Sequence, residues 1–154
     1  MRHIEQGTLG AVQESVGEFF AAQADDPRDL ETVLRDYIAM MAATYRDHRG
    51  TMRELVIGSW SDAEKQARRT DATRRILDVA TSWMLERPGV VGHRRPKAAL
   101  KVALLFATAA LRDVVLFDDT WVMGPEGVPS QQELEEELVQ AVLAHIKYQP
   151  PPRA

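Results

Sequence analysis

The residue types that commonly do chemistry are present, but their spacing builds no catalytic centre. None of the histidines, His3, His48, His93 and His145, follows a glutamate by three residues, whereas di-iron bundles place such Glu-x-x-His pairs on one helical face. Ser59 in "IGSWS" lacks the G-x-S-x-G frame of a nucleophile elbow. The chain has no cysteine to act as a nucleophile or thiolate ligand. We therefore expect no enzymatic activity, no metal site and no cofactor.

Two basic runs could contact phosphates, namely "ARRTDATRR" at residues 67–75 and "GHRRPK" at residues 92–97. Acidic Glu64, Asp71 and Asp78 lie in or near the first run, and the net charge of the chain is -4. Affinity for DNA comes largely from cations that meet phosphates, so this balance opposes a general nucleic-acid surface. The sequence favours a solvated helix face for both runs.

Length and composition indicate a single soluble domain. The 154 residues are 45% hydrophobic and 27% charged, enough to build a core. We expect one helical domain over residues 1–149 and a disordered tail over residues 150–154. The N-terminal "MRHIEQGTLG" has no apolar stretch of the signal-peptide kind. The apolar run 102–111 is shorter than the roughly 20 residues of a membrane span. We therefore expect a cytoplasmic protein with no membrane partner.

Apolar residues recur at helical spacing along the whole chain and predict an all-α fold of six helices with no sheet. The clearest amphipathic segment carries apolar residues at intervals of three and four: Leu30, Val33, Leu34, Tyr37, Ile38, Met41 and Tyr45.

Three helix starts can be predicted from capping residues. Asp26, followed by proline, is the expected N-cap of the second helix. Ser61 and Glu64 have the spacing of a capping box at the start of the fourth helix, and Ser130 and Glu133 have it at the start of the last.

The helix expected over residues 97–117, "KAALKVALLFATAALRDVVLF", is apolar over far more than one face. Its polar side chains fall in one narrow stripe, formed by Lys97, Lys101, Thr108 and Arg112. Asp113 stands alone on an apolar side, where it would pair with an arginine across an interface or line a pocket. A helix at the edge of one core needs an apolar arc of little more than 100°. This helix therefore needs cover on two sides.

The last helix has a similar excess of apolar surface and carries Leu134, Leu138, Ala141, Val142 and Ile146. Two such helices from each of two subunits would form a four-helix bundle and hold a homodimer together. The alternative is that both helices are central in the core of a monomer. Residues expected in or beside the dimer contact are Leu104, Leu111, Val115, Leu138 and Val142.

The order of these helices resembles a known family. The helix in "DPRDLETVLRDYIAMMAATYRDHRG", the short helix in "TMRELVIGSW" and the wide helix described above are similar to those of the C-terminal regulatory domain of the tetracycline-repressor (TetR) family of transcriptional regulators. The resemblance extends from about His3 to Tyr148 and is one of pattern, with no diagnostic motif. That family adds an N-terminal helix-turn-helix, which we expect to be missing here, so DNA would be contacted only through the missing domain.

The resemblance implies that a small hydrophobic or amphiphilic effector enters a cavity among the middle helices and shifts the domain between two arrangements. Trp60 and Trp83 are the strongest candidates to line it, because a buried indole N–H needs a partner. The alternative for each candidate is ordinary core packing. The full set of candidate ligand-binding residues is Tyr45, Met52, Leu55, Trp60, Ile76, Ala80, Trp83, Met84 and Phe106.

Two functions of different classes follow. The first is an effector-binding, homodimerising regulatory domain. The second is a helical interaction module that binds no effector and heterodimerises with intact regulators. An enclosed cavity near Trp83 would favour the first, and a fully packed interior the second.

Overall fold

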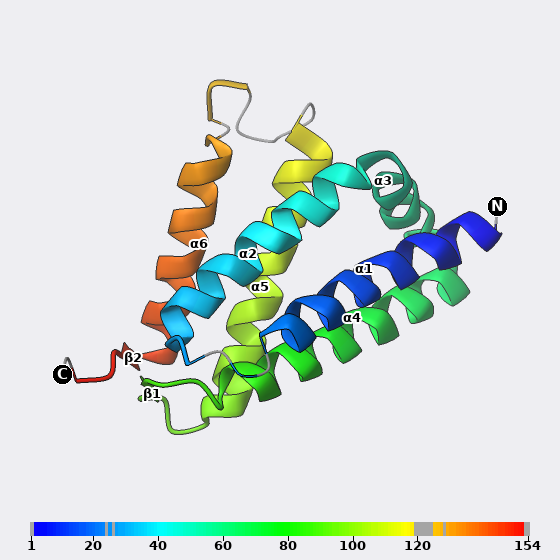
Figure 1. Cartoon of the computed structure of the whole chain (residues 1–154). Coiled ribbons are helices and arrows are strands. Elements are labelled where there is room, and N and C mark those ends of the chain that lie inside the picture. Colours follow the sequence, from blue (N-terminus) through cyan, green and yellow to red (C-terminus); the bar gives the residue numbers. More distant parts are fainter. Residues whose placement is uncertain (1, 24, 26, 119–124, 128, 153–154) are drawn as a thin grey trace.

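The described residues form six α-helices and one very short pair of strands (Figure 1). The computed structural model describes residues 2–23, 25, 27–118, 125–127 and 129–152, with side chains from residue 7 onward except those of Thr8 and Pro125. In chain order the elements are α1 (Arg2–Ala22), α2 (Leu30–Asp47), α3 (Arg49–Gly58), α4 (Ala63–Met84), β1 (Val90–Val91), α5 (Pro96–Phe117), the 3₁₀ turn η2 (Pro125–Gly127), α6 (Gln131–Ile146) and β2 (Tyr148–Gln149).

The helices pack as two groups that share α5 as a neighbour. Helices α1 and α4 lie side by side and run in the same direction (Figure 1). Helices α5 and α6 run in opposite directions, and α2 packs against both of them. Because α3 and α4 also contact α5, four helices of the same chain cover parts of its surface. None of the helices within the described residues has the length and apolarity that crossing a membrane requires.

The apolar face predicted for α2 is confirmed as the centre of the core. Every residue of the predicted stripe is buried: Leu30, Val33, Leu34, Tyr37, Ile38, Met41 and Tyr45. Full burial of a large aliphatic or aromatic side chain contributes roughly 1.5–3 kcal/mol. The three-and-four spacing of these residues therefore accounts for both the formation and the central position of α2.

The capping box predicted for the last helix is confirmed. The Ser130 hydroxyl accepts a hydrogen bond from the Glu133 backbone N–H at 3.2 Å, and the Glu133 carboxylate accepts one from the Ser130 N–H at 2.8 Å. Hydrogen bonding of the Glu133 carboxylate to the side chain and backbone of Ser130 lowers the pKa of Glu133 from its ordinary value.

The other two predicted caps differ from the structure. Helix α4 is capped by Asp62, whose carboxylate accepts from the backbone N–H groups of Glu64 and Lys65, so the capping box predicted from Ser61 is wrong. A carboxylate one position later satisfies two N–H groups without the serine. Helix α2 is capped by Asp29, which accepts from the Thr32 N–H at 2.9 Å. The predicted cap Asp26 lies outside the described residues.

The prediction that the fold has no sheet is wrong in one detail. Strands β1 and β2 pair antiparallel, with Val91 opposite Tyr148. Lys147 ends α6 in the left-handed conformation, with φ 54°, and so directs the chain into β2. Gly89 has φ 116°, and a Cβ there would lie 2.3 Å from the Tyr148 ring. Two-residue strands are too short to give an alternating pattern, so periodicity cannot detect them.

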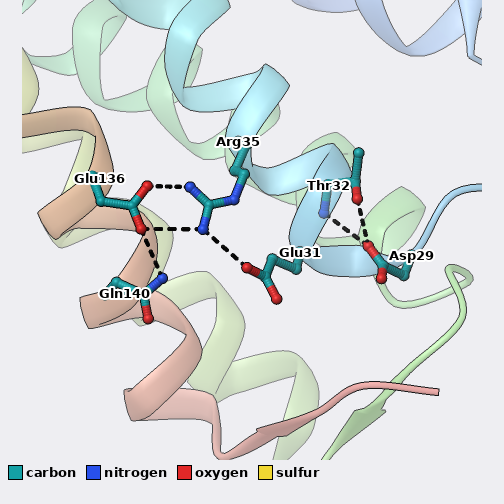
Figure 2. A network of polar contacts seen from close by, with 6 residues as sticks. All are labelled: Asp29, Glu31, Thr32, Arg35, Glu136 and Gln140. Atoms are coloured by element: carbon teal, nitrogen blue, oxygen red, sulfur yellow. Dashed lines mark hydrogen bonds and ion pairs between the residues drawn. The ribbon is translucent and has the colours of Figure 1, made fainter. Parts of the chain in front are cut away.

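A polar network on the surface joins α2 to α6 (Figure 2). Arg35 pairs with Glu31 of its own helix at 2.9 Å and with Glu136 of α6, and Gln140 donates to Glu136 at 2.9 Å. The hydrogen bond from Arg35 lowers the pKa of Glu136. Exposed ion pairs add little stability because water screens them. The network therefore links α2 to α6 on the surface but contributes little to the stability of their packing.

The hydroxyl of Tyr37, like that of Thr81, is a buried polar group without a hydrogen-bond partner among the described residues. The side chain of Tyr37 is 0% exposed and stacks on Phe20 at 5.8 Å between ring centroids. Burial strongly raises the pKa of Tyr37, with a smaller contribution from the nearby Tyr45. A buried hydroxyl without a partner costs free energy.

We predict that Tyr37→Phe stabilises the fold at pH 7 by about 1 kcal/mol, because the ring stays and the unpaired hydroxyl leaves. The folded-state pKa of Tyr37 lies above its unfolded value of about 10. Ionisation of Tyr37 therefore leaves the free energy of unfolding unchanged below that pH and lowers it as the pH rises above it. The variant should therefore also lose less stability in alkali. Urea unfolding at pH 7 and above pH 10 measures both effects, and a destabilised variant at pH 7 would contradict the unpaired hydroxyl.

Candidate functional site

Five of the predicted ligand-binding residues lie in the core. Tyr45, Met52, Leu55, Ala80 and Met84 are each at most 7% exposed and belong to one continuous cluster of buried residues. Burial raises the pKa of Tyr45 to about 12. For these five side chains the alternative of core packing describes the structure well.

The predicted inward placement of Trp60 and Phe106 is wrong. Trp60 is 71% exposed and Phe106 is 68% exposed. Trp60 lies just beyond α3 and stacks on Phe117, at 6.5 Å between ring centroids. Phe106 lies on a helix that is apolar on nearly every side, so the sequence does not distinguish its covered side from its open side.

Trp83 and Ile76 lie where α1 meets α4. Trp83 is half-buried, packs against Phe20 at 5.0 Å and carries the guanidinium of Arg87 4.0 Å from its ring centroid. Ile76 lines a surface hollow of about 220 Å³ together with Gln13, Val16, Gly17, Arg75 and Val79. Both residues therefore border the surface and do not enclose an interior cavity with the five core residues.

The structure also corrects the predicted dimer residues. Leu104 and Leu111 are 0% exposed and Val142 is 2% exposed within the single chain. Val115 and Leu138 are half-buried and pack against the same core. The three buried residues are covered by helices of their own chain, so they offer no surface to a second copy. For this side of α5, the alternative of a central core helix holds.

A different side of α5 remains open. Ala98, Val102, Leu105 and Phe106 are exposed, and their spacing of four, seven and eight residues from Ala98 places them on one face of the helix. We call these four residues the α5 face. On the neighbouring helix α6, Ala141 is exposed as well. The excess of apolar surface predicted for α5 is therefore present, but on this other flank.

Beside the α5 face runs a groove between α4 and α5. Its volume is about 350 Å³, within the usual range for small-molecule sites of roughly 300–1,000 Å³. Helices α4 and α5 follow one another in the chain, and Asp78 of α4 pairs with Lys101 of α5. The lining residues, called here the α4–α5 groove, are Arg69, Thr70, Thr73, Arg74, Leu77, Lys101, Leu105 and Arg112.

The four cations of the groove are unequally neutralised. Lys101 pairs with Asp78, Arg74 lies 3.5 Å from Asp71, and Arg112 pairs with the adjacent Asp113 at 2.7 Å. Within the described ranges, Arg69 has no carboxylate at ion-pairing distance. Partial burial lowers the pKa of Arg69, the charge of Arg112 lowers it further, and Asp113 opposes this effect.

Sequence reasoning missed Arg69 because it lies in a basic run that was expected to be a solvated helix face. That expectation describes its neighbours, since Arg68 pairs with Glu64 and Arg75 pairs with Asp71. Asp113 pairs with Arg112 of its own chain at 2.7 Å. The approach of Arg69 to Arg112 depends on how α4 packs against α5, which no local pattern encodes.

No known protein family, curated protein or solved structure matches the chain. Within the described residues, no group of three or more histidine, cysteine, aspartate or glutamate side chains is placed to hold a metal ion. The candidate site consists of the exposed α5 face and the α4–α5 groove, and Leu105 belongs to both.

We predict that Leu111→Ala lowers the free energy of unfolding by roughly 2–5 kcal/mol, as for other large-to-small changes in a core. Ile57→Ala serves as control because Ile57 is 45% exposed on α3, and it should change stability far less. Chemical unfolding followed by circular dichroism measures both variants. If Leu111→Ala dissociated a dimer but kept the free energy of unfolding of the wild type, the prediction would be wrong and Leu111 would lie in an interface between copies.

Proposed function

We propose that the chain is an effector-binding and homodimerising regulatory domain, similar to the C-terminal domain of TetR-family transcriptional regulators, that senses a small hydrophobic or amphiphilic molecule. The observation that carries the proposal is the α5 face, an apolar strip on the second-to-last helix of a six-helix domain. In this proposal, DNA is contacted only through a helix-turn-helix outside this chain.

The α5 face supports a second copy as its cover. Val102 and Leu105 are each 41% exposed and Phe106 is 68% exposed, which concentrates three large apolar side chains within five residues of one helix. Single exposed apolar residues need no explanation, but a contiguous strip commonly marks an interaction surface. A two-fold contact uses the same patch from both subunits. If α5 packed on α5 of a second copy, one contact would cover the apolar strip of each subunit.

The α4–α5 groove supports the effector-binding part of the proposal. Its walls belong to two different helices, so a molecule bound there would favour one relative placement of α4 and α5. A ligand shifts a conformational equilibrium only through different affinities for the two arrangements. Helix α4 also packs along α1, so a change in α4 would reach the N-terminal helix.

The helical interaction module remains the second candidate because of one observation. Tyr45, Met52, Leu55, Ala80 and Met84 are packed in the core, which is the arrangement expected of a domain without an interior effector cavity. The two candidates share the α5 face and differ in the partner that covers it. Self-association of the isolated chain would favour the first candidate, and a stable monomer would favour the second.

We predict that the wild-type chain is a dimer at micromolar concentration and that Phe106→Glu dissociates it into folded monomers, because the glutamate would bury a charge in the contact. Sedimentation equilibrium gives the mass, to be compared with the 17.3 kDa of one chain. A specific contact buries roughly 1,200–2,000 Å² in total, so the affinity should be measurable.

Val79→Glu is the matched control. Val79 is also an exposed large apolar residue, at 49%, but it lies on the α1 side of α4. The control should remain dimeric and should keep its helical circular dichroism. A wild-type monomer, or equal dissociation by the two substitutions, would refute a dimer through the α5 face.

A further inference from the structure

We propose that the α4–α5 groove binds an amphiphilic monocarboxylate, with the carboxylate on Arg69 and Arg112 and the apolar body along Leu77 and Leu105. The inference deepens the proposed function by naming the effector class and its site, and it rests on that function only for its regulatory meaning. Binding itself can be tested independently.

The anionic end of the ligand is indicated by the two arginines. Each guanidinium has five N–H donors in a planar fork that suits carboxylate oxygens. Asp113 accepts two hydrogen bonds from Arg112, which leaves other donors of Arg112 available. Arg69 is half-buried and has no carboxylate partner among the described residues. Two cations near one another that share a single carboxylate leave one positive charge to be balanced.

The shortage of carboxylates around Arg69 and Arg112 favours an anionic ligand of low charge. Lys101 and Arg112 pair with Asp78 and Asp113, and Arg74 shares Asp71 with Arg75. Among the cations of the groove, Arg69 has no carboxylate partner within the described residues. Partial burial lowers the pKa of Arg69 and the charge of Arg112 lowers it further, while Asp113 only partly opposes these effects. A carboxylate would supply a counter-charge for Arg69, whereas a dianion would also face the repulsion of Asp113.

The apolar end of the ligand is indicated by the rest of the groove. Leu77 is 4% exposed and forms part of the floor, while Leu105 is 41% exposed and forms part of the wall. Lys101 and Arg112 mark the two ends on α5, eleven residues apart, or about 16 Å at the helical rise of 1.5 Å per residue. An extended aliphatic or aromatic body therefore fits along the groove better than a compact one.

Leu105 connects the groove to the proposed dimer contact. It lines the groove and also belongs to the α5 face, so a ligand that packs on Leu105 would touch a side chain used by the second copy. By linkage, a ligand that changes the dimer affinity must bind the dimer and the monomer with different affinities. This gives the effector a route to the assembly state without an interior cavity.

The test is isothermal titration calorimetry, in which decanoate is added to the full chain below the critical micelle concentration of decanoate. Decyltrimethylammonium, with the same tail and a positive head, and acetate, with the carboxylate and no tail, are the ligand controls. We expect saturable binding of decanoate, and no measurable binding of the other two. Higher ionic strength should weaken binding of decanoate, because salt screens the charges of the groove.

Arg69→Gln should weaken decanoate binding roughly 10- to 100-fold, the loss expected for a hydrogen bond to a charged group. Arg75→Gln is the matched control, because Arg75 lies on the same helix but faces the α1 hollow; it should bind decanoate within about twofold of the wild type. Arg69→Gln should melt no lower than the wild type, because it removes an unpaired cation beside Arg112. Arg112→Gln provides a second variant should Arg69→Gln fold poorly.

Equal binding by wild type and Arg69→Gln, binding of decyltrimethylammonium as tight as that of decanoate, or no binding of decanoate would each overturn the site. Sedimentation of the same samples separates this result from the proposed function. A dimer that ignores decanoate would refute the groove and keep the dimeric domain. A monomer that binds decanoate through Arg69 would keep the groove and refute the dimer.

Discussion

The structure depends on covering α5, a helix that is apolar on nearly every side. Its inner residues Leu100, Leu104 and Leu111 are fully buried because α2, α3, α4 and α6 of the same chain all contact this helix. At about 25 cal/mol per Å² of apolar area, that burial is a leading favourable contribution to the fold. Four neighbours still leave the α5 face open, and this remainder motivates the proposed dimer.

The charges of the protein are arranged around this apolar centre. Arg35 and Glu136 join α2 to α6 on the outside, and Lys101 pairs with Asp78 where α4 meets α5. Such pairs cost little because both partners stay in contact with water. Arg69 differs, since it is partly withdrawn from water beside a second cation. A cation in that position carries an electrostatic cost until an anion binds. The groove is therefore a better candidate for a ligand than the hollow between α1 and α4, whose Arg75 pairs with Asp71.

Much of the fold could be predicted from the sequence because helices have a local code. The stripe from Leu30 to Tyr45 repeats with the helical period, and Ser130 with Glu133 forms its capping box from residues three apart. The site could not be predicted in the same way. Periodicity places Leu104 and Phe106 on an apolar helix, but only packing decides that Leu104 is buried and Phe106 exposed. The approach of Arg69 to Arg112 joins residues 43 positions apart and has no local signal.

The position of Leu105 decides how ligand and assembly would communicate. One side chain cannot pack against a ligand in the groove and against a second copy without each contact affecting the other. If the ligand orders Leu105 in the rotamer that the dimer needs, it strengthens the dimer; if it draws Leu105 into the groove, it weakens the dimer. Both outcomes require only the movement of one half-exposed side chain, whereas an interior effector would have to separate the packed core around Tyr45 and Met84. A surface groove beside the proposed contact would therefore be the less costly way for this fold to respond to a small molecule.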